Sequence, residues 1–172
     1  MNAEGIERAV RRMAREIADR ARERGGELAI VGIRRGGVHL AERIRRELAA
    51  ATGKEPPIGT LDIALYRDDL SGGAPAPVVG PTDIQFPVTG KTIVLVDDVL
   101  YTGRTARAAM DALLELGRPA AVRLAILVDR GHRELPIRAD YVGKNVPTAR
   151  GERVLVNLEE TDGEDGVIVV GD

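Results

Sequence analysis

Residues 92–105 read TIVLVDDVLYTGRT, and this stretch decides the fold class. It begins with an almost entirely apolar run, which is typical of a strand covered on both faces of a sheet. Two aspartates follow, and a Thr-Gly-Arg-Thr turn then leads into a helical pattern from Gly103 to Leu116. A buried strand, a polar loop and a helix in this order form the repeating unit of parallel α/β sheets.

The same unit recurs upstream and downstream of this stretch. Residues 28–33 form a short apolar run that ends in a glycine-containing loop, and residues 38–51 return to a helical pattern. An N-terminal helix is predicted from Ala3 to Arg24, because apolar residues recur there at steps of three and four. Residues 121–128 form another apolar strand. The alternation predicts an α/β fold with a mainly parallel twisted sheet flanked by helices.

The remaining segments are less regular. A third unit, residues 58–66, precedes a Gly-, Pro- and Asp-rich stretch over residues 67–87, which we expect to be a flexible loop. Three short C-terminal strands are expected to form an antiparallel cap over the edge of the sheet: 141–146, 153–158 and 167–170. The pattern shows no linker or repeat, so we predict a single domain over residues 1–172.

Composition limits the classes of function. The 172 residues include no cysteine and two histidines, which excludes disulfides and thiolate metal sites and leaves little for a zinc site. No stretch approaches the roughly 20 apolar residues that span a membrane, so we expect a cytoplasmic protein without membrane contact. The net charge of −2 argues against wholesale attraction to nucleic acid, so any RNA site must be a local basic patch.

The loop after the central strand combines an anion site with two carboxylates. A helix N-terminus presents unpaired amides and a positive dipole end to a phosphate, and Gly103 permits close approach of the backbone. The threonine hydroxyls and Arg104 add donors. Asp97 and Asp98 would repel a polyphosphate, but they suit sugar hydroxyls and a reaction centre that becomes positive. A ribose 5-phosphate with oxocarbenium character at C1 has both properties.

Two other interpretations of this stretch are disfavoured. An apolar strand followed by Asp-Asp also describes a Walker B strand, and residues 89–92 (TGKT) resemble the end of a Walker A loop. However, Gln85 stands where the first glycine of that loop is needed, and the lysine precedes a strand where it should open a helix. A plain surface turn would leave the downstream anion loop a coincidence.

Residues 96–105 resemble the PRPP (5-phosphoribosyl-1-pyrophosphate) signature of type I phosphoribosyltransferases. The resemblance implies the type I phosphoribosyltransferase fold, with a small hood and a flexible loop. In that family the acidic pair holds the ribose hydroxyls and the Thr-Gly-x-Thr turn holds the 5-phosphate. Carried across, Asp97 and Asp98 are the catalytic residues. The nucleotide-binding residues also include Val99, Leu100, Tyr101, Thr102, Gly103, Arg104 and Thr105.

A second loop is expected at the same end of the sheet. Residues 32–37 (GIRRGG) follow the second strong strand, and arginine suits pyrophosphate through planar multidentate donation. The resemblance implies that Arg34 and Arg35 bind pyrophosphate, often beside a non-proline cis peptide, and that Arg67 adds a contact. An ordinary turn with solvated arginines remains the alternative. Mg²⁺ is the expected cofactor, because it binds pyrophosphate with few protein ligands.

A closer resemblance covers nearly the whole chain. Residues 127–145 (LVDRGHRELPIRADYVGKN), with 65–70 and 96–105, resemble the bacterial pyrimidine operon attenuation proteins, which also have uracil phosphoribosyltransferase activity. The chain departs from them at residues 35–37, where Arg-Gly-Gly replaces their common Thr-Arg-Gly. The resemblance implies synthesis of UMP from uracil and PRPP. It also implies UMP-dependent binding of pyrimidine operon leader mRNA, favouring transcription termination, with UTP as a further ligand and a homodimer or homotetramer as the assembly.

The resemblance assigns two more sets of residues. Uracil selection is assigned to backbone groups around Asp129, Arg130 and Val154, the last in a hood contributed mainly by residues 137–172. The RNA footprint is a basic face made of Arg8, Arg12, Arg15, His132, Arg138 and Lys144. The first three share a helical face, although a helix arginine alone is more often solvated surface, and His132 is as readily explained as a surface or structural histidine. Two rivals remain: a phosphoribosyltransferase for another base without RNA regulation, and a regulator that keeps the PRPP loop only as a nucleotide sensor.

Overall fold

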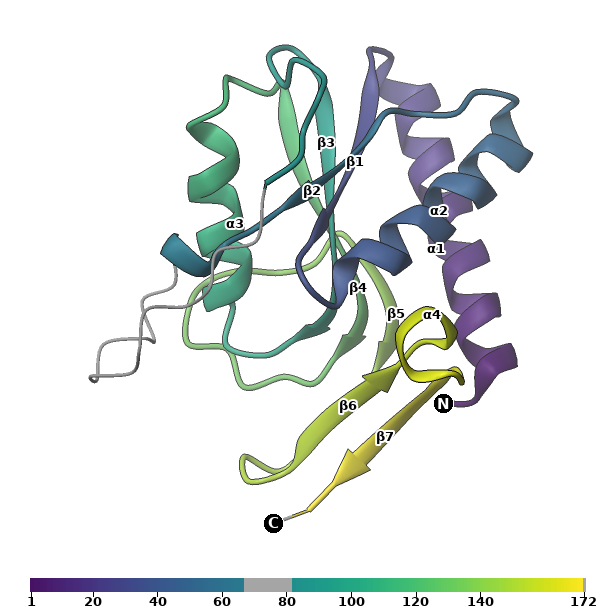
Figure 1. Cartoon of the computed structure of the whole chain (residues 1–172), viewed down its shortest axis with the longest axis vertical. Coiled ribbons are helices and arrows are strands. Elements are labelled where there is room, and N and C mark those ends of the chain that lie inside the picture. Colours follow the sequence, from purple (N-terminus) through teal and green to yellow (C-terminus); the bar gives the residue numbers. More distant parts are fainter. Residues whose placement is uncertain (67–81, 172) are drawn as a thin grey trace.

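A parallel sheet forms the centre of the molecule (Figure 1). The computed structural model describes residues 1–66 and 82–171. The sheet has five strands in the order β2-β1-β3-β4-β5, and every neighbouring pair is parallel. The strands are β1 (Leu28–Ile33), β2 (Ile58–Leu61), β3 (Thr92–Leu100), β4 (Ala121–Asp129) and β5 (Tyr141–Asn145). The predicted α/β fold with a mainly parallel sheet is confirmed.

Helices cover both faces of this sheet. The helices α1 (Ala3–Arg24) and α2 (Gly37–Thr52) lie on one face, and α3 (Arg104–Leu114) lies on the other (Figure 1). A short 3-10 helix, η1 (Ala64–Tyr66), follows β2. None of the helices in residues 1–66 and 82–171 is both long and apolar enough to cross a membrane.

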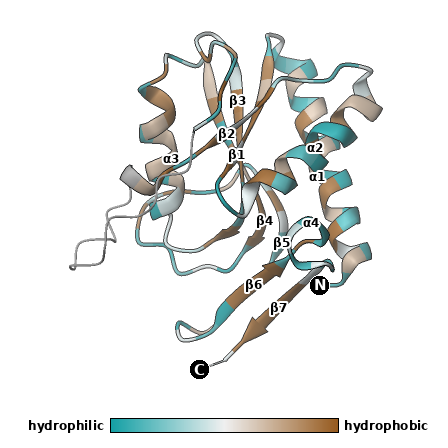
Figure 2. Ribbon diagram, in the orientation of Figure 1, coloured by the Kyte–Doolittle hydropathy of each residue, from teal (hydrophilic) through white to brown (hydrophobic). Residues whose placement is uncertain are grey.

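Each face of the sheet contributes to its own apolar core. Ile30 and Val94 pack with α1 and α2, whereas Val31 and Leu95 pack with α3. Successive side chains of a strand point to opposite faces, so a strand covered on both sides must be apolar at every position. This explains the continuous apolar runs of β1 and β3, which are coloured as hydrophobic in Figure 2.

The strand β3 is longer than predicted. It was expected to end at Val96, but it continues through Asp97 and Asp98 to Leu100. The extension has a physical cause in β4, which runs to Asp129 and provides backbone partners opposite Asp97, Val99 and Leu100. The acidic pair therefore lies within a strand and not in the loop after it.

The predicted antiparallel cap was wrong for its first strand. β5 joins the main sheet parallel to β4, with Ala125 opposite Tyr141. Its Tyr141 side chain is 2% exposed, because α1 covers that edge of the sheet. Short strand patterns carry no information on direction, and the connection over residues 130–140 returns the chain far enough for parallel pairing.

The other two C-terminal strands do form an antiparallel pair. β6 (Arg153–Asn157) and β7 (Gly166–Val170) pair with Leu155 opposite Ile168, and the four-residue helix α4 (Glu159–Asp162) follows β6. We call residues 153–170 the hood hairpin. It lies beyond the carboxyl ends of β3 and β4 (Figure 1). The predicted hood over 137–172 thus includes a strand of the main sheet, and most of the expected loop over 67–87 lies outside the described residues.

Candidate functional site

A cavity of about 310 Å³ opens at the carboxyl end of the sheet. Its wall includes the loop from β3 to α3, residues 99–105, together with Asp97 and Glu134. The PRPP site predicted from the sequence includes that loop and Asp97. The structure brings these residues together.

The start of α3 is built to accept an anion. Gly103 caps the helix with φ of 94°, a left-handed conformation that favours glycine. Having no side chain, Gly103 offers no cap to the amides of the first turn. The Thr102 hydroxyl accepts from the Arg104 amide at 3.3 Å, which tightens the turn. Helix-start amides aimed at a cavity are a ready phosphate site.

The two aspartates lie on opposite faces of β3. Asp97 lines the cavity on the side of α3 and is 7% exposed, and its Oδ1 accepts from the Asp98 amide at 2.9 Å. Asp98 points to the side of α2, where its Oδ1 accepts from the Val99 amide at 2.8 Å. Asp98 is not part of the cavity wall that Asp97 shares with residues 99–105.

The loop between β1 and α2 packs against the Asp98 side of β3. A Cβ atom at Gly36 would overlap the Asp98 carboxylate, and one at Gly37 would overlap the Val96 carbonyl. The two glycines are therefore required by the close approach of this loop to β3. The peptide bond between Arg34 and Arg35 is cis, as the resemblance implied.

Both arginines of this loop are exposed at the same end of the sheet as the cavity. The register sets this placement, since Gly32 of β1 lies opposite Val96 of β3. Arg67, the third predicted pyrophosphate contact, lies outside the described residues.

At the predicted uracil site, the side chains of Asp129 and Arg130 are hydrogen-bonded to other residues of the protein. Arg130 is 6% exposed, donates to Thr148 Oγ1 and the Ala149 carbonyl, and stacks 3.9 Å from the centre of the Tyr101 ring. The Asp129 carboxylate accepts from Arg133 at 2.5 Å. Backbone groups here are engaged as well: the Arg130 amide donates to the Leu100 carbonyl at 3.0 Å, and the Asp129 carbonyl accepts from the Val146 amide at 2.8 Å. Val154 lies on β6 and is half-buried against the apolar core.

Two residues that the sequence did not identify as functional hold the loop of residues 99–105 in place. Arg133 donates to the Tyr101 carbonyl at 2.9 Å as well as to Asp129. Glu134 forms an ion pair with Arg104 at 3.0 Å, and its amide donates to the Thr102 carbonyl at 2.9 Å. The RGHRE sequence at 130–134 signalled charged residues, but only the tertiary structure shows which loop they contact.

The predicted RNA residues on the first helix lie near one of those from the later segment. Arg8, Arg12 and Lys144 line one hollow of about 520 Å³ between the start of α1 and β5. Arg12 also donates to the carbonyls of Val142 and Gly143, at 3.0 and 2.6 Å. Arg15 is exposed on the same helix.

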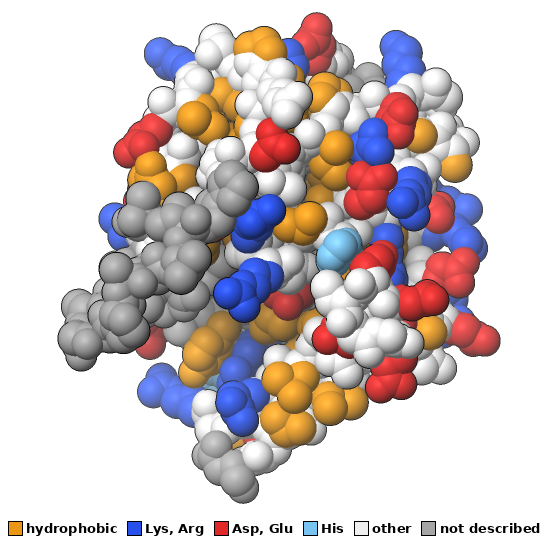
Figure 3. All heavy atoms as spheres, viewed as in Figure 1, with side chains coloured by type: hydrophobic (Ala, Val, Ile, Leu, Met, Phe, Trp, Pro, Cys, Tyr) orange, Lys and Arg blue, Asp and Glu red, His pale blue; other side chains and the backbone are white. Residues whose placement is uncertain are grey.

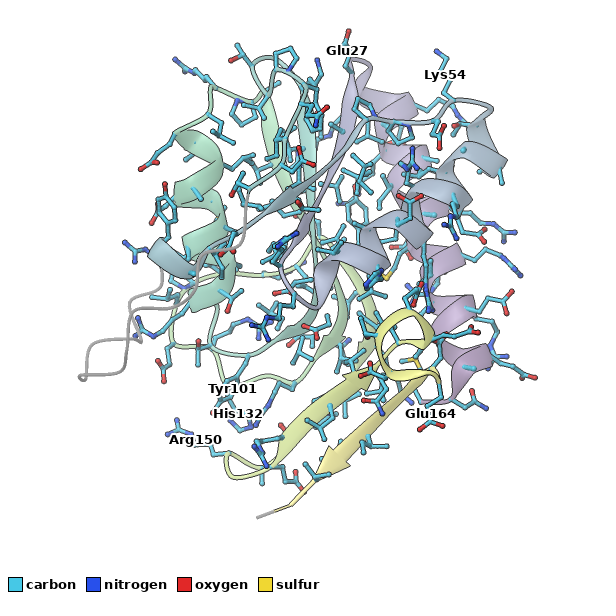
Figure 4. The ribbon with its side chains drawn as sticks, viewed as in Figure 1. Glu27, Lys54, Tyr101, His132, Arg150 and Glu164 are labelled. Atoms are coloured by element: carbon cyan, nitrogen blue, oxygen red, sulfur yellow. The ribbon has the colours of Figure 1, made fainter. Side chains whose placement is uncertain are left out.

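The other two residues predicted to bind RNA, Arg138 and His132, lie elsewhere. Arg138 lines a different hollow that includes Met110 of α3. The His132 ring donates to the Thr148 carbonyl and meets the Tyr101 ring edge-on, with ring centres 6.0 Å apart. Figure 4 shows Tyr101, His132 and Arg150 together near the turn before β6. The six residues therefore do not form one hollow, and Figure 3 shows basic and acidic side chains interspersed on the face that it presents.

The described residues hold no group of three or more His, Cys, Asp or Glu side chains arranged to bind a metal ion. The donors present at the cavity are the Asp97 carboxylate and hydroxyl and backbone groups of the loop. Such a donor set fits a cation that a polyphosphate ligand and water hold for the most part, as Mg²⁺ is often held.

Comparison with known proteins gives relatives over nearly the full length. The sequence model of the "Phosphoribosyl transferase domain" family matches residues 2–160. A Bifunctional protein PyrR of Chloroflexus aurantiacus is 58% identical, covering 99% of this chain and 93% of the relative. One of Thermus thermophilus is 61% identical, covering 97% and 92%. One of Deinococcus radiodurans is 55% identical, covering 96% and 90%.

Solved structures with the same fold include hypoxanthine phosphoribosyltransferase of Trypanosoma cruzi. Its complex with the product IMP superposes with a TM-score of 0.75 at 20% identity, covering 99% of this chain and 88% of that one. A second crystal structure of that enzyme also gives a TM-score of 0.75 at 20% identity, covering 98% and 93%. At this identity the likeness extends to the fold alone.

Proposed function

Because this chain belongs to the phosphoribosyl transferase family, and within it to the bifunctional PyrR proteins, we propose that it makes UMP and pyrophosphate from uracil and PRPP. One observation carries the proposal: the carboxylate of Asp97 and the start of α3 line a single cavity. An anion site and an acid within one small space suit a sugar phosphate whose anomeric carbon becomes positive.

The phosphate end of the substrate binds at the turn of residues 102–105. The amides at the start of α3 and the threonine hydroxyls donate to the 5-phosphate oxygens. Glu134 and Arg133 fix this turn from outside through Thr102 and Tyr101. Such prior fixing reduces the reorganisation needed when substrate binds.

The two aspartates act on the ribose from either side of the end of β3. Asp97 lies in the cavity with little exposure, where its charge is screened less by water and stabilises positive charge on the ring. Asp98, beside Gly36, accepts from a ribose hydroxyl next to the pyrophosphate loop. The separation of the pair gives each carboxylate its own part of the sugar to hold.

The reaction exchanges one bond at C1 of the ribose. The bond from C1 to the pyrophosphate oxygen breaks with its electron pair leaving on pyrophosphate, and N1 of uracil forms a new bond to C1. The proton on N1 passes to solvent or to a general base. Because N1 bonds directly to C1, no covalent protein intermediate is needed. Arg34 and Arg35 donate to the departing pyrophosphate.

Phosphoribosyltransferases generally use Mg²⁺ together with PRPP. When bound, the ion neutralises negative charge on pyrophosphate. In this chain the Asp98 carboxylate, which lies against the loop of residues 34–37, and the Asp97 carboxylate on the cavity side would be the acidic groups available to hold it.

The second activity is UMP-dependent binding of pyrimidine operon leader mRNA, which favours transcription termination. Support comes from the basic hollow around Arg8 and Lys144, both of which are exposed. Further support comes from His132, because its ring contacts Tyr101 of the nucleotide loop. That contact gives a physical route by which an occupied phosphate site can alter an RNA contact.

Two assays test the two activities separately. Incubation with labelled PRPP and each of uracil, adenine, guanine and hypoxanthine should give product with uracil. Turnover of a purine without turnover of uracil would instead support a transferase for another base. Electrophoretic shifts of leader RNA should require less protein when UMP is present. RNA affinity that does not respond to UMP would contradict the regulatory proposal, and RNA binding without any turnover would favour the nucleotide sensor.

A further inference from the structure

One arginine joins the hood hairpin to the helix behind the pyrophosphate loop. Arg43 of α2 donates to both carboxylate oxygens of Glu160, from Nε at 2.9 Å and from Nη2 at 2.6 Å. It also donates to both oxygens of Asp165, from Nη1 at 2.7 Å and from Nη2 at 2.8 Å. Glu160 lies on α4 and Asp165 lies just before β7. One guanidinium therefore contacts both ends of the segment that connects α4 to β7.

This cluster is more enclosed than the ion pairs on the outside of α1. The side chains of Arg43 and Asp165 are 18% and 14% exposed, whereas those of Arg8 and Glu4 are 70% and 79% exposed. Enclosure reduces screening by water, and planar bidentate pairing fixes direction as well as distance. The hydrogen bonds from Arg43 lower the pKa of both Glu160 and Asp165, although partial burial acts in the opposite direction.

The two elements that Arg43 joins both reach the site. α2 begins at Gly37, directly after the loop that carries Arg34 and Arg35. The hood hairpin carries Val154, around which the sequence predicts that uracil is selected. Apolar contacts of Leu158 and Val167 also attach the hairpin to the core. Apolar contacts are not directional. Two hydrogen bonds between Met1 and Val167, at 2.7 and 2.8 Å, attach β7 to the start of the chain. Arg43 adds a directional tie from the hairpin to α2, the helix that follows the loop of Arg34 and Arg35.

We infer that Arg43 is a positioning residue that sets the orientation of the hood hairpin relative to α2. The orientation of the hairpin in turn determines how uracil fits in the active site. The inference rests on the proposed function and on the predicted contact between uracil and the hairpin backbone around Val154. Arg43 acts through the hairpin, since it is not part of the wall of the sugar-phosphate cavity. Its removal therefore affects base binding more than PRPP binding.

The same helix supplies a matched control. The side chain of Arg45 is 22% exposed. It also forms ion pairs with two carboxylates, those of Glu42 at 2.7 Å and Glu55 at 2.6 Å. Glu42 lies on α2 itself, and Glu55 lies in the segment before β2. Replacing Arg45 thus removes a similar ion-pair cluster from the same helix without cutting a tie to the hairpin.

The experiment compares Arg43→Met and Arg45→Met by steady-state kinetics with Mg²⁺, uracil and PRPP. We expect Arg43→Met to raise KM for uracil by roughly tenfold, because a small misplacement of a binding group is amplified in the rate. KM for PRPP should change less than the KM for uracil. Arg45→Met should leave both constants close to wild type, and Arg43→Lys should recover part of the loss, since lysine restores the charge but not the bidentate geometry.

Amide hydrogen exchange gives a second measure that does not depend on turnover. Amides of β6 and β7 should exchange faster in Arg43→Met than in Arg45→Met, while those of β3 remain alike in both. If Arg43→Met does not fold, the triple variant Arg43→Met/Glu160→Gln/Asp165→Asn replaces it, because that change leaves no unpaired carboxylates.

The outcomes separate this inference from the proposed function. Equal shifts in KM for uracil and equal exchange rates in the two methionine variants would overturn the role of Arg43. Wild-type protein that fails to use uracil would overturn the proposed function instead. In that event the exchange comparison alone decides whether Arg43 orients the hairpin.

Discussion

Replacement of Gly36 by alanine should damage catalysis by way of a single carboxylate. The residue has φ of −65°, so alanine fits the backbone, and the harm must come from the added methyl group. That methyl group would overlap the Asp98 carboxylate, whose Oδ1 is held by the Val99 amide. Relief requires Asp98 to turn away or the pyrophosphate loop to move outward.

The expected size of the effect of Gly36→Ala has two parts, a loss of stability and a loss of activity. Overpacking of this kind costs about 1–3 kcal/mol of stability. Loss of a preorganised electrostatic contact lowers kcat by roughly 100-fold or more, which corresponds to about 2.7 kcal/mol in the barrier. We therefore expect Gly36→Ala to retain the fold and to lose roughly 100-fold in kcat/KM for PRPP, close to the loss expected for Asp98→Asn.

A double-mutant cycle tests the cause. Asp98→Ala removes both the carboxylate and the overlap, so adding Gly36→Ala to it should produce little further loss in kcat/KM. The assay is PRPP-dependent formation of UMP, with circular dichroism to confirm folding. Losses that simply multiply in the double variant would refute the reasoning, because they would show that Gly36 and Asp98 act independently.

Four further predictions test other parts of the site. Asp97→Asn should lower kcat by roughly 100-fold while the melting temperature changes little, and a wild-type kcat would remove the residue's assigned role. Glu134→Gln should raise KM for PRPP more than KM for uracil, because Glu134 braces the phosphate loop through Arg104; equal changes would contradict this. Lowered pKa values of Glu160 and Asp165 stabilise the fold above roughly pH 4, the unfolded-state value, and this contribution declines as pH falls through the folded-state values. Wild-type protein should thus lose more melting temperature between pH 6 and about pH 3 than the Glu160→Gln/Asp165→Asn variant, and parallel curves would count against it. Arg138→Ala should weaken RNA binding and reduce its salt slope by about one if the residue meets a phosphate, whereas an unchanged slope would indicate a solvated side chain.

Local pattern was sufficient for the central unit of the fold. Residues 92–105 indicated strand, polar loop and helix because full burial demands an apolar side chain at each strand position. The order of a strand, a glycine and a helical pattern also predicted that a helix starts directly after Gly103, where α3 begins. Such features depend on neighbours in the sequence, which a pattern can represent.

Long-range partners decided the features that pattern missed. The direction of β5 depends on how the chain returns over residues 130–140, and the brace at Glu134 depends on Arg104 lying 30 positions earlier. The tie between Arg43 and the hood hairpin spans an even longer separation. Charged residues of these kinds occur throughout the chain, so their types alone do not identify which pairs meet.

The placement of the acidic pair shows how one long-range contact changes the chemistry of a motif. If β3 ended at Val96, as the pattern predicted, both aspartates would lie in a loop and could turn to the same side of the sugar. Because β4 pairs with β3 as far as Leu100, the alternation of a strand sends Asp97 and Asp98 to opposite faces. One carboxylate therefore faces the cavity lined by residues 99–105, and the other faces the loop of residues 34–37, to which the proposed function assigns pyrophosphate. A ribose between those two loops would be held from both sides, with its C1 atom on the path between them.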